Sequence, residues 1–147
     1  RRTIPQIALM TGRSEEEVAA IVRQCEENGT IVRYKTVVNW EKLGEEPVIA
    51  LIEVRVAPQR GAGFDAIASR IARFPEVRSC YLVSGAYDLA LVVTGKTMKD
   101  ISAFVSERLS TLDSVQGTTT HFLLKRYKED GEMLNVVEER TRLAVTP

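Results

Sequence analysis

The residues best suited to chemistry lie in one short stretch, where a polar turn leads into an apolar run. The stretch is Ser84-Gly85-Ala86-Tyr87-Asp88, and Leu89-Ala90-Leu91-Val92-Val93 follows it. Glycine permits positive φ beside a hairpin, and Asp88 places a carboxylate where a buried strand begins. A carboxylate next to a flexible turn at the start of a buried strand suits a small-ligand site at a sheet edge. The same residue types also form ordinary turns, in which Asp88 would satisfy only the amides of its own hairpin.

The composition is that of a globular protein of about one domain. The chain has 147 residues, of which 44% are hydrophobic and 27% charged, enough to bury a core. No apolar run approaches the ~18 residues of a membrane span, and no charged-then-apolar leader is present. We therefore expect a cytoplasmic protein without a membrane partner. The first residues are Arg-Arg-Thr rather than Met, so we expect a fragment, a processed form or the ordered part of something longer.

Charge and cysteine usage argue against several kinds of site. Lys and Arg number 20, as do Asp and Glu, so the overall field does not indicate nucleic acid. Cys25 and Cys80 lie far apart in the sequence and form no CxxC motif, and the chain contains a single histidine. These counts exclude an ordinary zinc framework. We expect both to be reduced, buried thiols. No catalytic triad, carboxylate pair or phosphate loop stands out, so we expect no cofactor and no enzyme.

Two helices and a strand are predicted in the first part of the chain. One helix covers residues 3–10, and a second begins at a capping box and covers residues 14–29. Two helices about four residues apart are typical of a helix-turn-helix. The alternation over residues 31–34 predicts a wing strand. Charges, glycine and proline then mark a boundary, so we expect domains at residues 1–46 and 47–147.

Strands and helices follow residue 47 in the order βαββαβ. The expected strands are 48–56, 77–83, 89–93 and 118–127, and the expected helices are 64–72 and 97–109. This order favours an α+β, ferredoxin-like fold with the first and third strands in the middle of an antiparallel sheet. Both middle strands are apolar at consecutive positions although two helices cover only one face, which predicts an isologous dimer through the other face. Residues 132–143 are a weak helix candidate, with a strand in the tail as the alternative.

The order and spacing of these features resemble the Lrp/AsnC family, the feast/famine regulators. The residues that carry the resemblance flank two turns: Gly29, Ile31, Tyr34, Gly85, Tyr87 and Asp88. The resemblance implies a bacterial or archaeal DNA-binding transcription regulator, dimeric through its sheets and often octameric, which binds an amino-acid effector between dimers beside the hairpin. The chemistry agrees, because Asp88 suits an ammonium and the amides of Gly85 and Ala86 suit a carboxylate. Ser84, Tyr87 and a neighbouring chain would shape the pocket.

The helix-turn-helix departs from the family in two respects. The family has another helix before the pair, and the second helix here carries five glutamates against Arg23 alone. Residues 1–46 hold 7 basic and 8 acidic side chains, a net charge of −1 that opposes attraction to phosphate. DNA contact would rest on Arg13, Ser14, Arg23, Arg33 and Lys35. The alternative is a stand-alone amino-acid-sensing module that does not bind DNA.

An enzyme is the alternative from a different class. Siroheme decarboxylases resemble Lrp/AsnC proteins and carry a degenerate helix-turn-helix over the same sheet. Their tetrapyrrole bears many carboxylates and would need basic groups and a proton donor, for which the candidates are His121, Lys125 and Arg126. A lone histidine on a threonine-rich strand is more often structural. The regulator therefore remains the main expectation.

Overall fold

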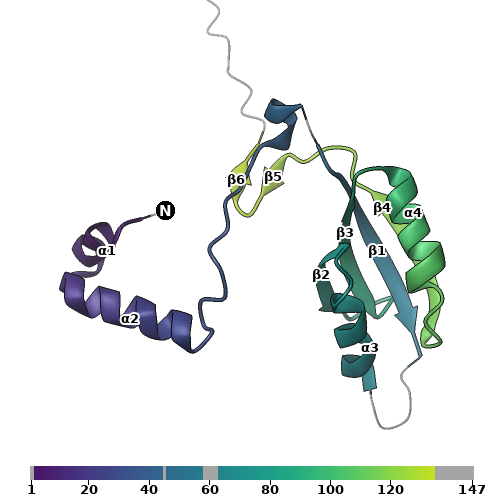
Figure 1. The fold of residues 1–147 in the computed structure, drawn as a ribbon, viewed down its shortest axis with the longest axis horizontal. Helices are drawn as coiled ribbons and strands as arrows, with labels where there is room; N and C mark the ends of the chain where they lie inside the picture. The colour runs from purple at the N-terminus through teal and green to yellow at the C-terminus, as the bar shows by residue number, and fades with distance from the viewer. Residues whose placement is uncertain (1, 45, 58–62, 135–147) are drawn as a thin grey trace, which may run out of the picture. The chain divides into compact units, whose positions relative to one another are not determined.

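The chain folds as two compact units in the computed structural model, Arg1–Val38 and Asn39–Pro147 (Figure 1). The structure describes residues 2–44, 46–57 and 63–134. The division falls before residue 39, whereas the sequence suggested a boundary after residue 46. The side-chain amide of Asn39 donates a hydrogen bond of 2.7 Å to the carbonyl of Leu134, which ties Asn39 to the second unit.

Two helices make up most of the first unit, as predicted. Helix α1 (Ile4–Thr11) and helix α2 (Glu15–Glu27) each begin at a capping box, with Thr3 and Ser14 as the N-cap residues. The chain leaves α2 through Gly29, whose φ of 75° is the left-handed conformation that commonly ends a helix. Local capping chemistry therefore sets both ends of α2.

The wing strand expected at residues 31–34 is not formed. A strand needs a neighbour for its backbone hydrogen bonds, and the described part of the first unit contains no second strand. The segment instead returns to α2: the Tyr34 hydroxyl donates to Glu26 Oε1 at 2.8 Å, and the Ile31 N–H donates to the Cys25 carbonyl at 2.8 Å. This segment is held by local hydrogen bonds rather than by a ladder.

The second unit has the predicted βαββαβ order. A 3-10 helix (Trp40–Leu43) precedes the main elements, which are β1 (Val48–Val56), α3 (Gly63–Ala72), β2 (Val77–Leu82), β3 (Leu89–Gly95), α4 (Met98–Phe104) and β4 (Val115–Phe122). The strands pair antiparallel in the order β2-β3-β1-β4, so the first and third strands are central, as in a ferredoxin-like fold. Strand β4 lies earlier than the predicted 118–127, because its ladder with β1 runs from Val56 back to Ala50.

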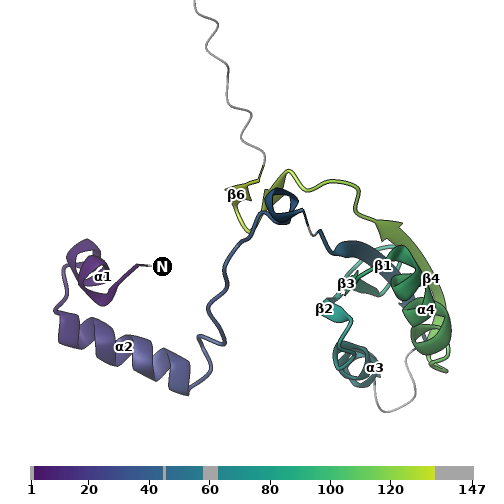
Figure 2. The same ribbon diagram turned by 45° about the horizontal axis from the view of Figure 1, so that its top comes forward.

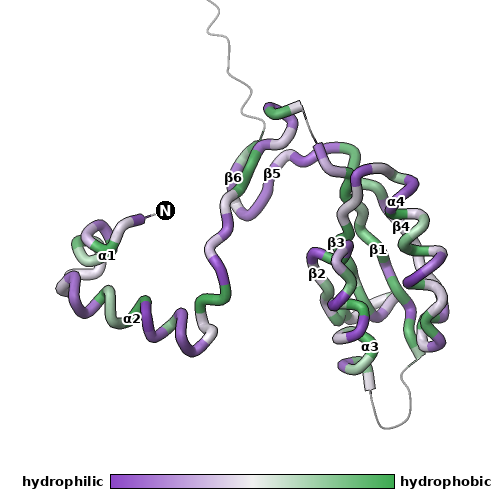
Figure 3. The backbone as a smooth tube through the Cα atoms, in the orientation of Figure 1, coloured by the Kyte–Doolittle hydropathy of each residue, from purple (hydrophilic) through white to green (hydrophobic). Residues whose placement is uncertain are grey.

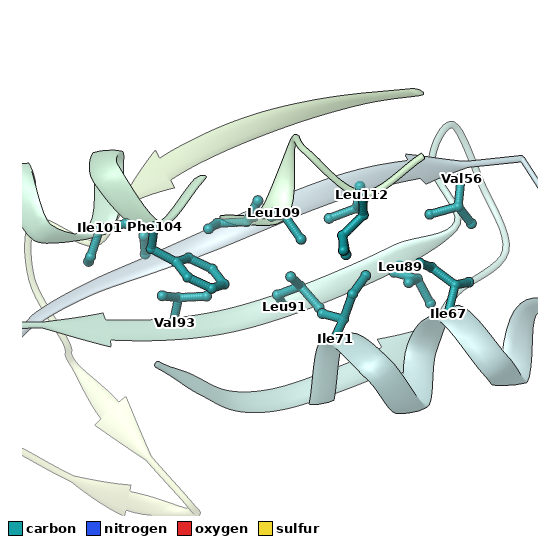
Figure 4. Close-up of a cluster of buried hydrophobic side chains, with 13 residues drawn as sticks. Val56, Ile67, Ile71, Leu89, Leu91, Val93, Ile101, Phe104, Leu109 and Leu112 are labelled. Carbon is teal, nitrogen blue, oxygen red and sulfur yellow. The ribbon is translucent and has the colours of Figure 1, made fainter. Parts of the chain in front are cut away.

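Alternate residues of the two central strands build the core. Helices α3 and α4 cover the same side of the sheet (Figure 2). Their side chains meet every second residue of β1 and β3 in one buried cluster (Figure 4), formed by Ala50, Ile52, Val54, Val56, Ile67, Ile71, Leu89, Leu91, Val93, Ile101, Phe104, Leu109 and Leu112. Such burial of apolar surface is the dominant stabilising contribution to the fold.

The uncovered face of the sheet is partly apolar. Cross-strand pairing places Leu51 beside Val92 and His121, and Tyr81 lies on the same face. Leu51 is 37% and Tyr81 57% exposed. Glu53 lies on this face too, with its Oε1 3.3 Å from His121 Nε2. Apolar residues dominate β1 and β3 (Figure 3), and both faces are apolar over residues 48–52 and 89–93, as predicted, whereas Glu53 makes the uncovered face of β1 charged beyond residue 52.

A short hairpin follows the sheet where the sequence suggested a break. Strands β5 (Lys128–Glu129) and β6 (Glu132–Met133) pair around Asp130 and Gly131, whose φ angles are 45° and 87°. Asp-Gly favours two-residue hairpins because both positions need positive φ. The weak helix predicted from residue 132 is therefore wrong at its start, and residues 135–143 lie outside the described residues.

The second helix of this unit departs from a regular α-helix. It begins at the predicted capping box of Thr97 and Asp100 and continues beyond Phe104 as a π-helical turn, Val105–Leu109. This turn presents Arg108 to two aromatic rings: its guanidinium carbon lies 4.5 Å from the ring centroid of Phe74 and 5.9 Å from that of Phe104. The Phe74 and Phe104 rings are themselves edge-to-face, 5.5 Å apart.

We expect Arg108→Ala to lower the free energy of unfolding by about 1–2 kcal/mol. The variant loses the cation–π contacts, worth about 0.5–1 kcal/mol at exposed sites, and also the ion pair that Arg108 makes with Glu76. Urea unfolding measures the change. Arg108→Lys keeps the charge but lacks the planar stacking group, so its free energy of unfolding should lie between those of the wild type and Arg108→Ala. A wild-type midpoint for Arg108→Ala would contradict this role.

Candidate functional site

The loop between β2 and β3 holds the five predicted effector residues at one end of the sheet. Ser84, Gly85 and Ala86 are exposed, while Tyr87 and Asp88 are half-buried. Gly85 has a φ of 153°, and a Cβ at this position would meet no atom within 4 Å other than those of Gly85 and its two neighbours in the chain. A ligand can therefore approach the backbone here without meeting a side chain.

Asp88 attaches this loop to the end of β1. Its Oδ2 accepts a hydrogen bond of 2.8 Å from the Val56 N–H. Its own N–H donates to the Val54 carbonyl at 3.0 Å, and its carbonyl accepts from the Val83 N–H at 2.9 Å. The side chain thus bonds to a neighbouring strand and not to the amides of its own hairpin. The carboxylate stays half-buried at the mouth of the loop, where an ammonium group could pair with it.

The sequence does not predict the hydrogen bond between the Val56 N–H and the Asp88 carboxylate. The two residues lie 32 positions apart, and they meet because β1 and β3 are neighbours in the sheet. The βαββαβ order predicts that neighbourhood but not its register. Since register decides which amide faces the carboxylate, no local signal identifies Val56.

The five candidate DNA-contacting residues belong to the first unit, and all are exposed. Arg13 lies between the helices, Ser14 caps α2, Arg23 lies on α2, and Arg33 and Lys35 follow it. The Ser14 Oγ accepts the N–H of the third helical residue at 3.2 Å, so its hydroxyl already serves the helix. Hydrophilic residues predominate on α2 (Figure 3), in keeping with its glutamates.

The three residues that a decarboxylase would need do not share one site. His121 pairs with Glu53 on the uncovered face of the sheet. Lys125 and Arg126 line a small cavity beside the start of β1, and His121 is not among its lining residues. The arrangement therefore lacks the combination of proton donor and basic pocket that the enzyme hypothesis requires.

Cys25 and Cys80 are free thiols, half-buried rather than buried, and burial raises the pKa of the Cys80 thiol. Within the described ranges, no group of three or more His, Cys, Asp or Glu side chains could hold a metal ion. None of the helices described is both long enough and apolar enough to cross a membrane.

Known proteins resemble the chain over most of its length. The family described as the Lrp/AsnC ligand binding domain matches residues 49–133. The HTH-type transcriptional regulator YugG of Bacillus subtilis is 47% identical over 100% of this chain and 89% of its own. Regulator FL11 of Pyrococcus furiosus is 27% identical over 87% of this chain and 82% of its own. The structure of transcriptional regulator NMB0573 from Neisseria meningitidis, a complex with L-Met, is 25% identical, with a TM-score of 0.69 over 92% of this chain and 87% of that one.

Proposed function

Because the chain belongs to the Lrp/AsnC family of transcriptional regulators, we propose that it binds DNA and responds to a free amino acid. One observation carries the effector part of this proposal: the open backbone of Gly85 and the half-buried Asp88 belong to the same loop, three residues apart. These are the two kinds of group that a zwitterion needs. The relatives are named as regulators, which favours this function over the decarboxylase.

The effector binds at the β2–β3 loop. Its ammonium pairs with Asp88, and its carboxylate accepts hydrogen bonds from the amides of Gly85 and Ala86. Ser84, Tyr87 and residues of a neighbouring chain surround its side chain. The L-Met complex of the Neisseria regulator supports an amino acid as the ligand.

A thermal-shift panel of the twenty amino acids tests the effector proposal. A ligand at ~100 times its Kd stabilises the native state by about 2.7 kcal/mol, which raises the melting temperature by several degrees. A selective rise with one or a few amino acids at millimolar concentration is the expected result. No rise with any of the twenty would contradict an amino-acid effector.

The first unit makes the contact with DNA. Binding to DNA would place the protein in the cytoplasm. Positive charge comes from Arg13, Arg23, Arg33 and Lys35, with Ser14 at the start of α2, while the glutamates of α2 keep the attraction to phosphate modest. We expect the affinity for a labelled promoter fragment to fall as the salt concentration rises, with a slope set by the few phosphates that these residues neutralise. Fluorescence anisotropy at a series of salt concentrations measures this slope. Absence of binding at low salt would favour a sensing module without DNA.

A dimer forms through the uncovered face of the sheet, where Leu51 and Val92 lie side by side. Higher assemblies such as octamers would bring neighbouring chains to the β2–β3 loop. We expect Leu51→Asp to convert the dimer to a monomer, because it places a carboxylate in the middle of an apolar contact. Light scattering after size exclusion measures the mass. Leu9→Asp, at a residue that is 87% exposed in the first unit, is the control and should stay dimeric. A dimeric Leu51→Asp would place the interface elsewhere.

A further inference from the structure

A broad groove lies at the end of the sheet away from the β2–β3 loop, where β3 ends. The ladder brings three segments together there. Gly95 at the end of β3 pairs with Val48 at the start of β1, and the Thr94 N–H donates at 3.0 Å to the carbonyl of Glu76, the residue before β2. The groove has a volume of about 560 Å³, within the range of about 300–1,000 Å³ that is usual for small-molecule sites. It is therefore large enough for a ring system with a charged substituent.

An aromatic side chain forms one wall of this groove. Trp40, in the 3-10 helix before β1, is the only tryptophan of the chain and lines the groove together with Pro47. Trp40 is 38% exposed, although an indole gains much from burial. Planar rings stack on an aromatic face whatever polar groups they carry at their edges. This wall therefore suits a planar, unsaturated ring.

Two cations line the same groove. Arg78 on β2 and Lys96 just after β3 are both exposed, and in the part of the chain that the structure describes neither side chain makes a hydrogen bond or an ion pair. Glu46 also belongs to the lining, and its carboxylate accepts a hydrogen bond of 3.0 Å from Arg126. Even when Glu46 is counted in full, it leaves a net charge of +1 with Arg78 and Lys96. The groove therefore favours an anionic group beside its aromatic wall.

We propose that this groove binds a free nucleotide, with the base against Trp40 and the phosphate toward Arg78 and Lys96. A phosphate monoester carries about −1.5 to −2 charges at pH 7, which matches two cations. The identity of the base matters little for stacking, since every base has a ring face. Duplex DNA is disfavoured as the ligand, because its bases already stack on one another. The proposal goes beyond the response to an amino acid and uses no group of the β2–β3 loop.

Tryptophan fluorescence of the full chain tests this assignment, because Trp40 is its only source. The probes are AMP, adenosine and inorganic phosphate, which separate the contributions of base and phosphate. Each is titrated from micromolar to millimolar concentration, the range of affinity expected for a small ligand in an open groove. We expect AMP to quench the Trp40 emission with saturation. Adenosine should bind about threefold to 20-fold more weakly, the effect of two exposed charge pairs, and phosphate alone should leave the emission unchanged.

Four variants locate the two parts of the ligand by calorimetric titration with AMP. Arg78→Gln and Lys96→Gln should each weaken binding by about twofold to fivefold, the scale of one exposed charge pair. Arg70→Gln is the matched control, because Arg70 is exposed on α3 and does not line the groove, and it should bind AMP as the wild type does. Trp40→Leu keeps an apolar side chain but removes the ring, so it should weaken binding by about fivefold or more.

Three results would overturn the proposal. The first is an emission that AMP does not quench to saturation. The second is adenosine binding as tightly as AMP, which would leave the two cations without a role. The third is an unchanged affinity for AMP in both Arg78→Gln and Lys96→Gln. Repeating the fluorescence titration in Asp88→Asn separates the groove from the effector site, because a response that arises at Trp40 persists when the β2–β3 loop has lost its charge.

Discussion

Asp88→Asn should strongly reduce the thermal response to the effector while leaving the protein almost as stable as the wild type. The asparagine carbonyl can still accept the 2.8 Å hydrogen bond from Val56, so the loop remains attached to β1. The negative charge is lost, however, and with it the charge-assisted bond to the ammonium. Such bonds contribute about 1.5–3 kcal/mol, so the affinity should fall by roughly 10-fold to 100-fold. Calorimetric titration with the selected amino acid measures the loss.

Asp88→Ala is the matched comparison. It removes the charge and the acceptor together, so the effector affinity should fall at least as much as in Asp88→Asn. The free energy of unfolding should also fall by about 1–2 kcal/mol, because the Val56 N–H loses its partner. Urea unfolding separates the two variants. If Asp88→Asn bound the effector like the wild type, the carboxylate would serve only to hold the end of β1, and the assignment of the ammonium partner would be wrong.

Leu91→Ala should lower the free energy of unfolding by about 3–5 kcal/mol. Leu91 is fully buried on the central strand β3, opposite Ile52 on β1 and Cys80 on β2, and under both helices (Figure 4). Truncation there loses transfer energy and leaves a cavity, a combination that costs this much in rigid cores. Since domains of this size have about 5–15 kcal/mol in total, a large share of the stability would be lost.

The neighbouring residue supplies the control for Leu91→Ala. Val92 faces the uncovered side of the sheet and is half-buried, so Val92→Ala should cost less than about 1 kcal/mol in a monomer. Both substitutions are best made in the Leu51→Asp background, where dimer contacts do not contribute. Equal losses for Leu91→Ala and Val92→Ala would mean that both faces of the sheet are buried within one chain.

The features that the sequence predicts well are those that depend on near neighbours. The capping box at Ser14, the left-handed Gly29 and the box at Thr97 each involve residues within three positions, and all form as expected. The predicted wing strand at residues 31–34 does not form, because a strand depends on a distant partner rather than on near neighbours. Its alternation is genuine, but a strand requires a partner, and the sequence pattern carries no information about one. The Asp130-Gly131 turn carries a local signal of its own, because these residue types favour the positive φ that a tight hairpin needs.

The two candidate sites differ in how far the sequence predicts them. The β2–β3 loop is contiguous, so its glycine and carboxylate can be recognised together from the sequence alone. The groove beside Trp40 combines residues from three separate segments, around Trp40, Arg78 and Lys96. Its members are ordinary aromatic, polar and basic residues that become a site only through their juxtaposition. A search for local motifs therefore finds the first site and not the second.

The hydrogen bond from Asn39 to Leu134 can form only late in synthesis. Its partners lie 95 residues apart, and at about 5–20 residues per second the second leaves the ribosome roughly 5–20 s after the first. Strand β1 likewise waits for β4, its neighbour on one side. The first unit, which relies on local contacts, can fold long before this. A nascent chain therefore presents a finished helix pair well before the sheet closes.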